Sequence, residues 1–356
     1  SIMTTRNDAL ADAHERLAAY RYVDGVGFAF HGPMGAETLS TMGHDDLVAG
    51  WVEAYKARNQ PLDAPPTGED IVAGDEASWR SALGDPSRVS DWEVLFARQL
   101  REHPWPAVVG RWVPHLLPGY AGALTHGIIR TAHAVRALPA EGPPSDLLLR
   151  ELGRGLAYWA ATYLRLPGRP ELRGRLTLDE ALRALPRPEQ AWSPIEAGTF
   201  ARLGELARFA GAVEALGPPE SLDDALSDLT AASCRLLLDN PGVVPVGPIH
   251  AVTPTAAARV LLPYLPDVSV ATLYAQLWHV NAAIAAGFTP APASTAPADG
   301  DDAPVAGVAE LVARAVEHRD THVVKFTEAC VREHARRPDP VYLRAAQRVI
   351  EQMPPW

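Results

Sequence analysis

A helical spacing of apolar residues recurs along nearly the whole chain, whereas runs that alternate as in a β-strand are almost absent. Many of the 33 prolines stand between the periodic segments, as in Leu117-Pro118-Gly119, where they end one helix and fix the direction of the next. The pattern predicts an all-α fold, either a compact multi-helix body or stacked helical hairpins. The expected helices are Asp8–Tyr20, Glu37–Ala57, Asp91–Glu102, Leu124–Leu138, Asp146–Leu164, Ala201–Leu216, Leu222–Leu238, Val268–Ala286, Val308–His318 and His322–Arg336.

The chain has 356 residues, of which 47% are hydrophobic and 21% charged, so it carries enough apolar material for a core. This length suits one large helical domain or two fused helical lobes, and we expect a single domain over residues 1–356. The segment Thr289–Pro304 lacks large apolar residues and is rich in Pro, Ala and Asp. Its composition favours a flexible surface linker, with a lid over an active site as the alternative.

The charge pattern argues against two classes of partner. The net charge is −11, and no run of five or more Lys and Arg is present to follow a phosphate backbone, so we expect no nucleic acid partner. No stretch reaches the roughly 18 to 20 consecutive apolar residues of a membrane span, and the N-terminus is too polar for a signal peptide. We therefore expect no membrane association and a cytoplasmic location.

The sequence offers little for thiolate, flavin or nicotinamide chemistry. The two cysteines, Cys234 and Cys330, lie far apart in the chain and form neither a disulfide framework nor a thiolate metal motif. Gly25-Val26-Gly27 lacks the third glycine and the strand context of a dinucleotide fingerprint, and no Walker or Gly-x-Ser-x-Gly signature appears. Any metal must then be bound by His, carboxylate or a less usual ligand.

Most of the 12 histidines stand among polar neighbours, but four stand in apolar or helix-facing contexts. An unpaired imidazole there would be costly, which favours a bound partner. These four residues are His31, His126, His250 and His322. On the helix that begins near His126, helical spacing places Arg130 and His133 on the same face.

Lys325 is one of only two lysines, and it lies between Val324 and Phe326, three residues after His322. Its side chain could extend past these apolar neighbours to a surface carboxylate such as Glu328. Alternatively it is buried, in which case desolvation lowers its pKa and leaves free amine able to add carbon dioxide. The product, a carbamate, is an anionic oxygen ligand for a metal.

His318 and His322 have the i, i+4 spacing of a zinc-binding helix. The intervening residues are Arg319, Asp320 and Thr321, so the glutamate of a metalloprotease is missing. A zinc hydrolase is therefore a minor alternative. A second alternative is a catalytically inactive helical protein that only binds an aromatic ligand.

Several motifs, taken in order along the chain, resemble the questin oxidase-like family of non-haem iron oxygenases. They are HGPMGAETL from His31, DW followed by PW and LLPG, LTHGIIRTAHAVRAL, IHAVT and, above all, THVVKFTEAC up to Cys330. Fungal members act on aromatic polyketides and open an anthraquinone ring. The resemblance implies an Fe(2+)-dependent oxygenase that cleaves a C–C bond or inserts oxygen in a Baeyer-Villiger manner.

The resemblance also implies a ligand set. It assigns His31, His126, His250, His322 and carboxylated Lys325 to the iron, and it places Arg130 and His133 beside the metal as catalytic candidates, with His279 as a weaker reserve ligand.

Neutral imidazoles with one anionic oxygen suit iron(II), and we expect a site assembled from several helices. The expected partners are a small aromatic substrate and molecular oxygen, with external NADPH as a reductant. Tyr274 and Trp278, one helical turn apart, are candidates for lining a pocket for a flat substrate, although core packing is the favoured role of each.

Overall fold

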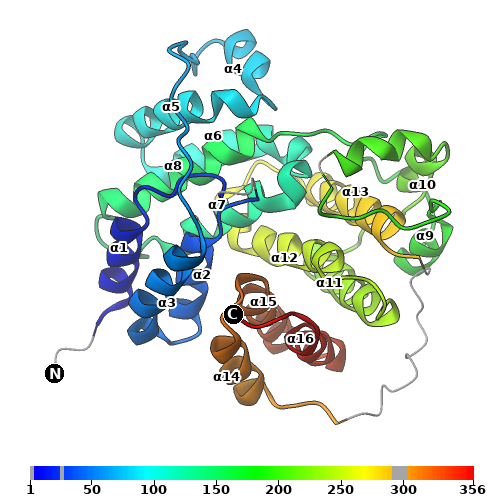
Figure 1. Ribbon diagram of the computed structural model, residues 1–356. Coiled ribbons are helices and arrows are strands. Elements are labelled where there is room, and N and C mark those ends of the chain that lie inside the picture. The colour runs from blue at the N-terminus through cyan, green and yellow to red at the C-terminus, as the bar shows by residue number, and fades with distance from the viewer. Residues whose placement is uncertain (1–3, 25–27, 197, 291–303) are drawn as a thin grey trace. The chain divides into compact units, whose positions relative to one another are not determined.

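The computed structural model describes residues 4–24, 28–196, 198–290 and 304–356 (Figure 1). Within these ranges strand-like pairing is limited to isolated bridges, such as the one between Tyr120 and Leu164, and the all-α prediction is confirmed. The contacts divide the chain into two compact units. The first comprises Ser1–Arg165 and Ala257–Asp267, and the second comprises Leu166–Ala256 and Val268–Trp356. That the chain forms a single domain stays a prediction.

In the first unit, α8 packs against α5 and α7, while α2 packs against α3 and α7. Trp92, Trp112 and Trp159 are almost fully buried in this unit and supply much of its apolar core. Its elements are α1 (Arg6–Arg16), α2 (Gly32–Thr41), α3 (Asp45–Arg58), α4 (Glu76–Ala82), η1 (Pro86–Arg88), α5 (Val89–Glu102), α6 (Trp105–Leu116), η2 (Leu117–Gly119), η3 (Gly122–Thr125), α7 (His126–Ala137), α8 (Asp146–Ala161) and η5 (Leu262–Tyr264).

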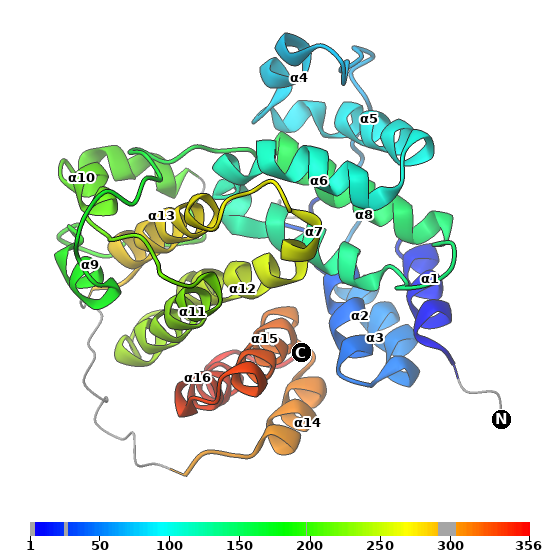
Figure 2. The same ribbon diagram turned by 180° about the vertical axis from the view of Figure 1, so that it is seen from behind.

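In the second unit, α15 packs against α14 and α16, and α11 packs against α13 and α16 (Figure 2). Its buried core includes Phe326, Tyr342 and the free thiols of Cys234 and Cys330. Its elements are α9 (Leu178–Ala184), η4 (Thr199–Glu205), α10 (Phe209–Glu214), α11 (Leu222–Asp239), α13 (Val270–Phe288), α14 (Val308–His318), α15 (Thr321–Arg336), α16 (Pro340–Gln352) and α12 (Val246–Leu261), which is assigned to this unit as far as Ala256.

The predicted helices agree with the structure where apolar periodicity is long and uninterrupted. Val308–His318 is α14 with the same bounds, but the single helix expected over Glu37–Ala57 is wrong. There α2 and α3 are separated by a turn at Gly43, whose φ of 89° lies in the left-handed region that favours glycine. The stretch Ala201–Leu216 likewise divides into η4 and α10.

Five α-helices in the described part of the chain were not predicted from the sequence, and one of them, α16, has a strong apolar period. Two of them contain an internal proline, Pro114 in α6 and Pro254 in α12, whereas the sequence pattern predicts that prolines end helices. The others are the short α4 and α9 and the C-terminal α16. Most of the predicted linker, residues 291–303, lies outside the described residues. At its start, Thr289 is buried and its hydroxyl donates to the Ala285 carbonyl.

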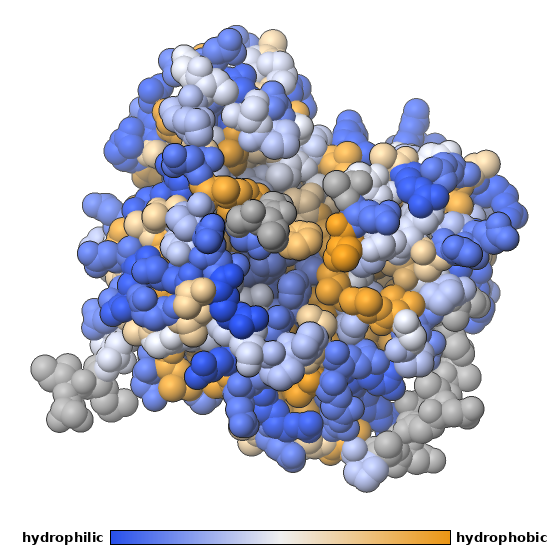
Figure 3. Space-filling model, in the orientation of Figure 1, coloured by the Kyte–Doolittle hydropathy of each residue, from blue (hydrophilic) through white to orange (hydrophobic). Residues whose placement is uncertain are grey.

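Among the described residues no helix has both the length and the apolar character needed to cross a lipid bilayer. Hydrophilic side chains cover most of the face shown in Figure 3, with apolar residues in smaller patches. Single exposed apolar residues, such as Ile195 and Val244, are normal for a folded protein.

Candidate metal centre

His31 and His126 form a close pair inside the first unit. Their Nε2 atoms lie 2.9 Å apart, and the two rings stand nearly perpendicular at 84°. Both residues are buried. His31 directly precedes α2, and its backbone N–H donates to the Tyr55 hydroxyl at 3.0 Å, which fixes the backbone from which the imidazole projects. Two ring nitrogens at this distance can share one proton or turn their lone pairs toward one cation.

The tautomer of His126 is determined by a backbone acceptor. Its Nδ1 lies 2.6 Å from the Ala123 carbonyl oxygen. A carbonyl can only accept, so Nδ1 carries the proton and Nε2 of the neutral ring has a lone pair. His126 therefore presents to His31 the nitrogen that a metal ion would bind.

The Ala123 carbonyl reaches His126 because the backbone before α7 is left-handed. Ala123, Leu124 and Thr125 have φ values of 49°, 48° and 68°. Three consecutive non-glycine residues in this region are unusual, since each costs roughly 1–2 kcal/mol. Glycines on either side allow the close packing that holds this turn. A Cβ on Gly122 would lie 1.5 Å from the Thr162 carbonyl oxygen, and a Cβ on Gly127 would meet Trp159.

His250 and His322 form a second pair, inside the second unit. Their ring centroids are 5.7 Å apart with an interplanar angle of 75°. His250 is buried on α12, and its Nδ1 lies 2.6 Å from the Val246 carbonyl oxygen one turn earlier. As in His126, this bond places the proton on Nδ1 and the lone pair on Nε2.

His322 is near the start of α15 and is oriented by Asp320, the N-cap residue of that helix. Asp320 Oδ1 accepts from the His322 backbone N–H at 2.9 Å and lies 3.3 Å from His322 Nδ1. Burial alone would raise the pKa of Asp320, but the hydrogen bonds and charge of His322 outweigh burial and lower it. Asp320 is thus an anion beside the imidazole, and it favours a proton on Nδ1.

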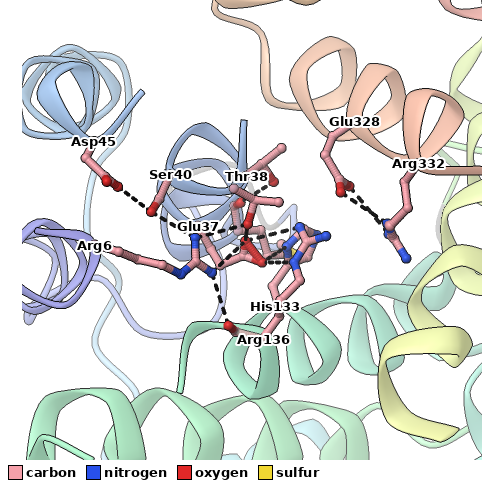
Figure 4. A network of polar contacts seen from close by, with 11 residues as sticks. Arg6, Glu37, Thr38, Ser40, Asp45, His133, Arg136, Glu328 and Arg332 are labelled. Carbon is pink, nitrogen blue, oxygen red and sulfur yellow. Dashed lines mark hydrogen bonds and ion pairs between the residues drawn. The ribbon is translucent and has the colours of Figure 1, made fainter. Parts of the chain in front are cut away.

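Lys325 lies one turn beyond His322 on α15, and only 3% of its surface is exposed. The interpretation that it extends to Glu328 at the surface is wrong, because the lysine is buried and the Glu328 carboxylate pairs with Arg332 at 3.1 Å (Figure 4). Burial lowers the pKa of Lys325 to about 7, partly offset by the charge of Asp320. A substantial fraction of this side chain is therefore neutral amine near pH 7.

The ring nitrogens within each unit are donors of the kind that a divalent transition metal binds. In His126, His250 and His322, Nδ1 faces an oxygen acceptor, which leaves Nε2 as the available lone pair. Metal-binding histidines typically show this arrangement, because the outer hydrogen bond fixes the tautomer and orients the ring. Imidazole donors with an oxygen anion suit iron and zinc better than magnesium or calcium.

Arg130 and His133, the predicted catalytic residues, both take part in buried ionic contacts of the first unit. The Arg130 guanidinium binds Glu151 through two bonds of 2.7 and 3.0 Å and also donates to the Arg21 carbonyl. His133 Nδ1 lies 3.4 Å from Glu37. Their predicted role in catalysis stays a prediction.

Glu37 stands at the centre of a polar network, with the side chains of Arg6, His133 and Arg136 directed toward it (Figure 4). Although burial raises the pKa of Glu37, the cations around it lower that pKa far below its usual range. His133 therefore faces a buried carboxylate anion.

The remaining candidates have structural partners. His279 Nε2 lies 2.8 Å from the Pro167 carbonyl, and His318 uses one ring nitrogen toward the Met353 carbonyl at 2.7 Å and the other toward the Asp320 N–H at 3.3 Å. The His318 contacts weaken the zinc-helix alternative. Trp278 is fully buried and donates to the Val213 carbonyl, so its favoured role in the core is confirmed, and Tyr274 is buried on the same helix.

Two contributors to the candidate site were not predicted from the sequence. Asp320 could have been noticed, since an aspartate two residues before His322 is a typical N-cap. The left-handed turn at Ala123 left no signal, because none of its residues is a glycine or asparagine.

No protein-family model matches the chain, and no curated protein matches it either. The resemblance to the questin oxidase-like family therefore stays a prediction.

Proposed function

We propose that this protein is a non-haem iron-dependent oxygenase that acts on an aromatic polyketide quinone of the anthraquinone type. The reaction is an oxidative C–C bond cleavage or a Baeyer-Villiger-type insertion of oxygen. His31, His126, His250, His322 and carboxylated Lys325 are assigned as iron ligands, and the substrate class comes from the resemblance of the motifs around them to the questin oxidase-like family.

The observation that carries the proposal is the protonation pattern of the histidines. His126 and His250 each donate from Nδ1 to a backbone carbonyl at 2.6 Å, and His322 faces the Asp320 carboxylate with its Nδ1. Core histidines that serve only packing need no common tautomer. A shared Nδ1-protonated form leaves Nε2 as the base, which is the form that binds a metal through Nε2.

Lys325 supports an anionic oxygen in the same ligand set. Its free amine attacks carbon dioxide, forming one N–C bond and releasing one proton, and the product is a carbamate with a single negative charge. The reaction needs a neutral amine shielded from water, and Lys325 is 3% exposed with a pKa lowered to about 7 by burial. A carboxylated lysine side chain is longer than Asp or Glu, so it can place its anionic oxygen further from the backbone of α15.

Iron supplies the one-electron chemistry that activates molecular oxygen, which no protein side chain provides. The chain's own residues orient the ligand rings and exclude water from them, since His31, His126 and His250 are all buried. An electron-rich hydroquinone substrate can itself supply the electrons for its oxidation. NADPH then acts from solution, by reducing the quinone before it binds.

Metal analysis and oxygen labelling test the proposal together. Protein purified from iron-supplemented cells should contain about one iron per chain. Aerobic incubation with reduced and oxidised hydroxyanthraquinones under ¹⁸O-labelled oxygen, followed by mass spectrometry, should give a ring-opened or lactone product that carries the label. Turnover that continues under strict anaerobiosis, or that needs stoichiometric flavin, would show that the assignment is wrong.

The same experiment separates the two alternative functions. Stoichiometric zinc in place of iron, without oxygen uptake, would indicate a hydrolase. Tight binding of the quinone with neither metal nor oxygen uptake would indicate a protein that only binds an aromatic ligand.

A further inference from the structure

Asp320 makes two different contacts with the residue that follows it by two positions. Its Oδ1 accepts from the backbone N–H of His322 at 2.9 Å, and the same atom lies 3.3 Å from the imidazole Nδ1. The first contact caps α15. The second involves the ring of a proposed iron ligand and adds nothing to capping.

Capping alone does not require an aspartate at this position. Ser145, Ser221 and Ser269 are the N-cap residues of α8, α11 and α13, and each accepts from a backbone N–H of its helix. Serine and aspartate are about equally good at this position. Aspartate is also an ordinary cap, as Asp339 is in α16. What distinguishes Asp320 is the additional contact of its carboxylate with the imidazole of His322.

The backbone of Asp320 is held by contacts that do not involve its side chain. The Asp320 N–H donates to His318 Nδ1 at 3.3 Å, and the other ring nitrogen of His318 lies 2.7 Å from the Met353 carbonyl. Arg319, between them, is left-handed with a φ of 72° and ends α14. The carboxylate is thus presented to His322 by a turn that contacts both α14 and the chain after α16.

The geometry points to Asp320 as a positioning residue of the iron site: its carboxylate accepts the Nδ1 proton of His322, fixes the ring orientation and leaves Nε2 to bind the metal. This inference rests on the proposed function. A carboxylate behind a ligating histidine also makes that histidine a stronger donor, and removal of such an outer partner typically weakens metal binding 10- to 100-fold.

Two substitutions separate capping from positioning. Asp320→Ser keeps a capping oxygen but is too short to reach the imidazole. Asp320→Asn keeps one acceptor oxygen at Oδ1, the atom that makes both contacts, but replaces the second carboxylate oxygen with an NH2 donor and removes the charge. Asp339→Ser is the matched control, because Asp339 caps α16 by accepting from the Val341 N–H and is not assigned to the site. Anaerobic titration of the full chain with Fe(II) should show affinity about 10- to 100-fold weaker for Asp320→Ser, an intermediate loss for Asp320→Asn, and wild-type affinity for Asp339→Ser.

A measurement without metal distinguishes failure of this inference from failure of the proposed function. In metal-free protein labelled with ¹⁵N-histidine, His322, assigned by comparison with His322→Gln, should be Nδ1-protonated in the wild type and shift toward the Nε2-protonated form in Asp320→Ser. An Nε2-protonated His322 in the wild type, or unchanged Fe(II) affinity in Asp320→Ser, would overturn the inference. The wild type could bind no iron while Asp320→Ser still loses the Nδ1-protonated form of His322. That result would refute the oxygenase but would support the contact between Asp320 and His322.

Discussion

The Nδ1 atom of His126 lies 2.6 Å from the carbonyl oxygen of Ala123, three residues earlier in the chain. This bond depends on left-handed backbone at Ala123, Leu124 and Thr125, a conformation that L residues rarely adopt in succession. Strained backbone persists only where the surrounding structure holds it, and it is found preferentially at functional sites. The turn therefore lowers the stability of the folded protein, and it places the carbonyl that orients His126, one of the proposed iron ligands.

Ala123→Gly should relieve part of this strain. Glycine removes the steric penalty of about 1–2 kcal/mol at a φ of 49° but costs about 0.5–1 kcal/mol of backbone entropy, so the free energy of unfolding should stay equal or rise by up to about 1.5 kcal/mol. Ala54→Gly, inside α3, is the control and should lower it by about 1 kcal/mol. Urea unfolding of both variants checks this. Equal destabilisation by the two substitutions would mean that the turn is not strained.

His250→Ala should abolish iron binding while the helical circular dichroism stays close to that of the wild type. The ring is buried, and its Nδ1 bond to the Val246 carbonyl closes within a single turn of α12, so loss of that bond leaves the helix backbone paired. The control is His103→Ala, which removes an exposed imidazole at the end of α5. Elemental analysis of the three purified proteins gives the answer, and full iron content in His250→Ala would remove this residue from the ligand set.

Lys325→Ala should be inactive and partly rescued by acetate or propionate, because a short carboxylate can occupy the position of the carbamate. Lys325→Arg should be inactive without rescue, since a guanidinium keeps its charge and adds no carbon dioxide. Lys56→Arg is the control at the only other lysine, which pairs with Glu53 on an exposed helix face. A carbamate signal in ¹³C NMR under ¹³CO₂ should be present in the wild type and in Lys56→Arg. Wild-type activity in Lys325→Arg would contradict the carbamate.

Arg130→Met tests whether Arg130 acts in catalysis or in folding. The guanidinium and Glu151 are both buried, and removal of one partner leaves an uncompensated charge, which costs about 3–5 kcal/mol. Arg80→Met breaks an exposed pair with Glu76 and should cost less than about 1 kcal/mol. Chemical denaturation gives both values. An Arg130→Met protein that loses turnover at unchanged stability would instead support a direct role in the reaction.

Helices could be predicted from the sequence where burial of one face imposes a period of about 3.6 residues, as in α14 and α15. The same argument failed at α12, which carries His250, because Pro254 interrupts the pattern while the helix continues through it. A proline inside a helix removes one hydrogen bond, and packing on the helix can compensate for that loss.

The candidate ligands could be identified one at a time but not as pairs. His31 and His126 are separated by 95 positions, and the 2.9 Å contact between them depends on how α2 packs against α7, which no local pattern encodes. The burial of Lys325 could be suspected from its neighbours Val324 and Phe326, yet a side chain of that length could also have reached the surface. Only the packing of α15 decides between the two.

The burial of Lys325 also predicts how stability depends on pH. Its pKa is about 7 in the folded protein and near 10.5 in the unfolded chain. Below pH 7 both states are protonated, and the folded protein bears the full cost of a buried charge. Between pH 7 and 10.5 the unfolded chain binds one proton more, so the free energy of unfolding rises with pH, by at most about 1.4 kcal/mol per unit.

Lys325→Met lacks this titration, so metal-free, carbon dioxide-depleted wild type should be less stable than Lys325→Met at pH 6, and the difference should narrow steadily from pH 7 to pH 9. Urea unfolding at each pH gives the free energy of unfolding of both proteins. In the difference between the two values, the contributions of titratable groups that both proteins share cancel. In the control Lys56→Met, the difference in stability from wild type should stay constant over this pH range, because Lys56 is not buried and pairs with Glu53 at the surface. If the curves of wild type and Lys325→Met ran parallel over this range, Lys325 would be charged in the folded protein, and the free amine that carbamate formation needs would be absent.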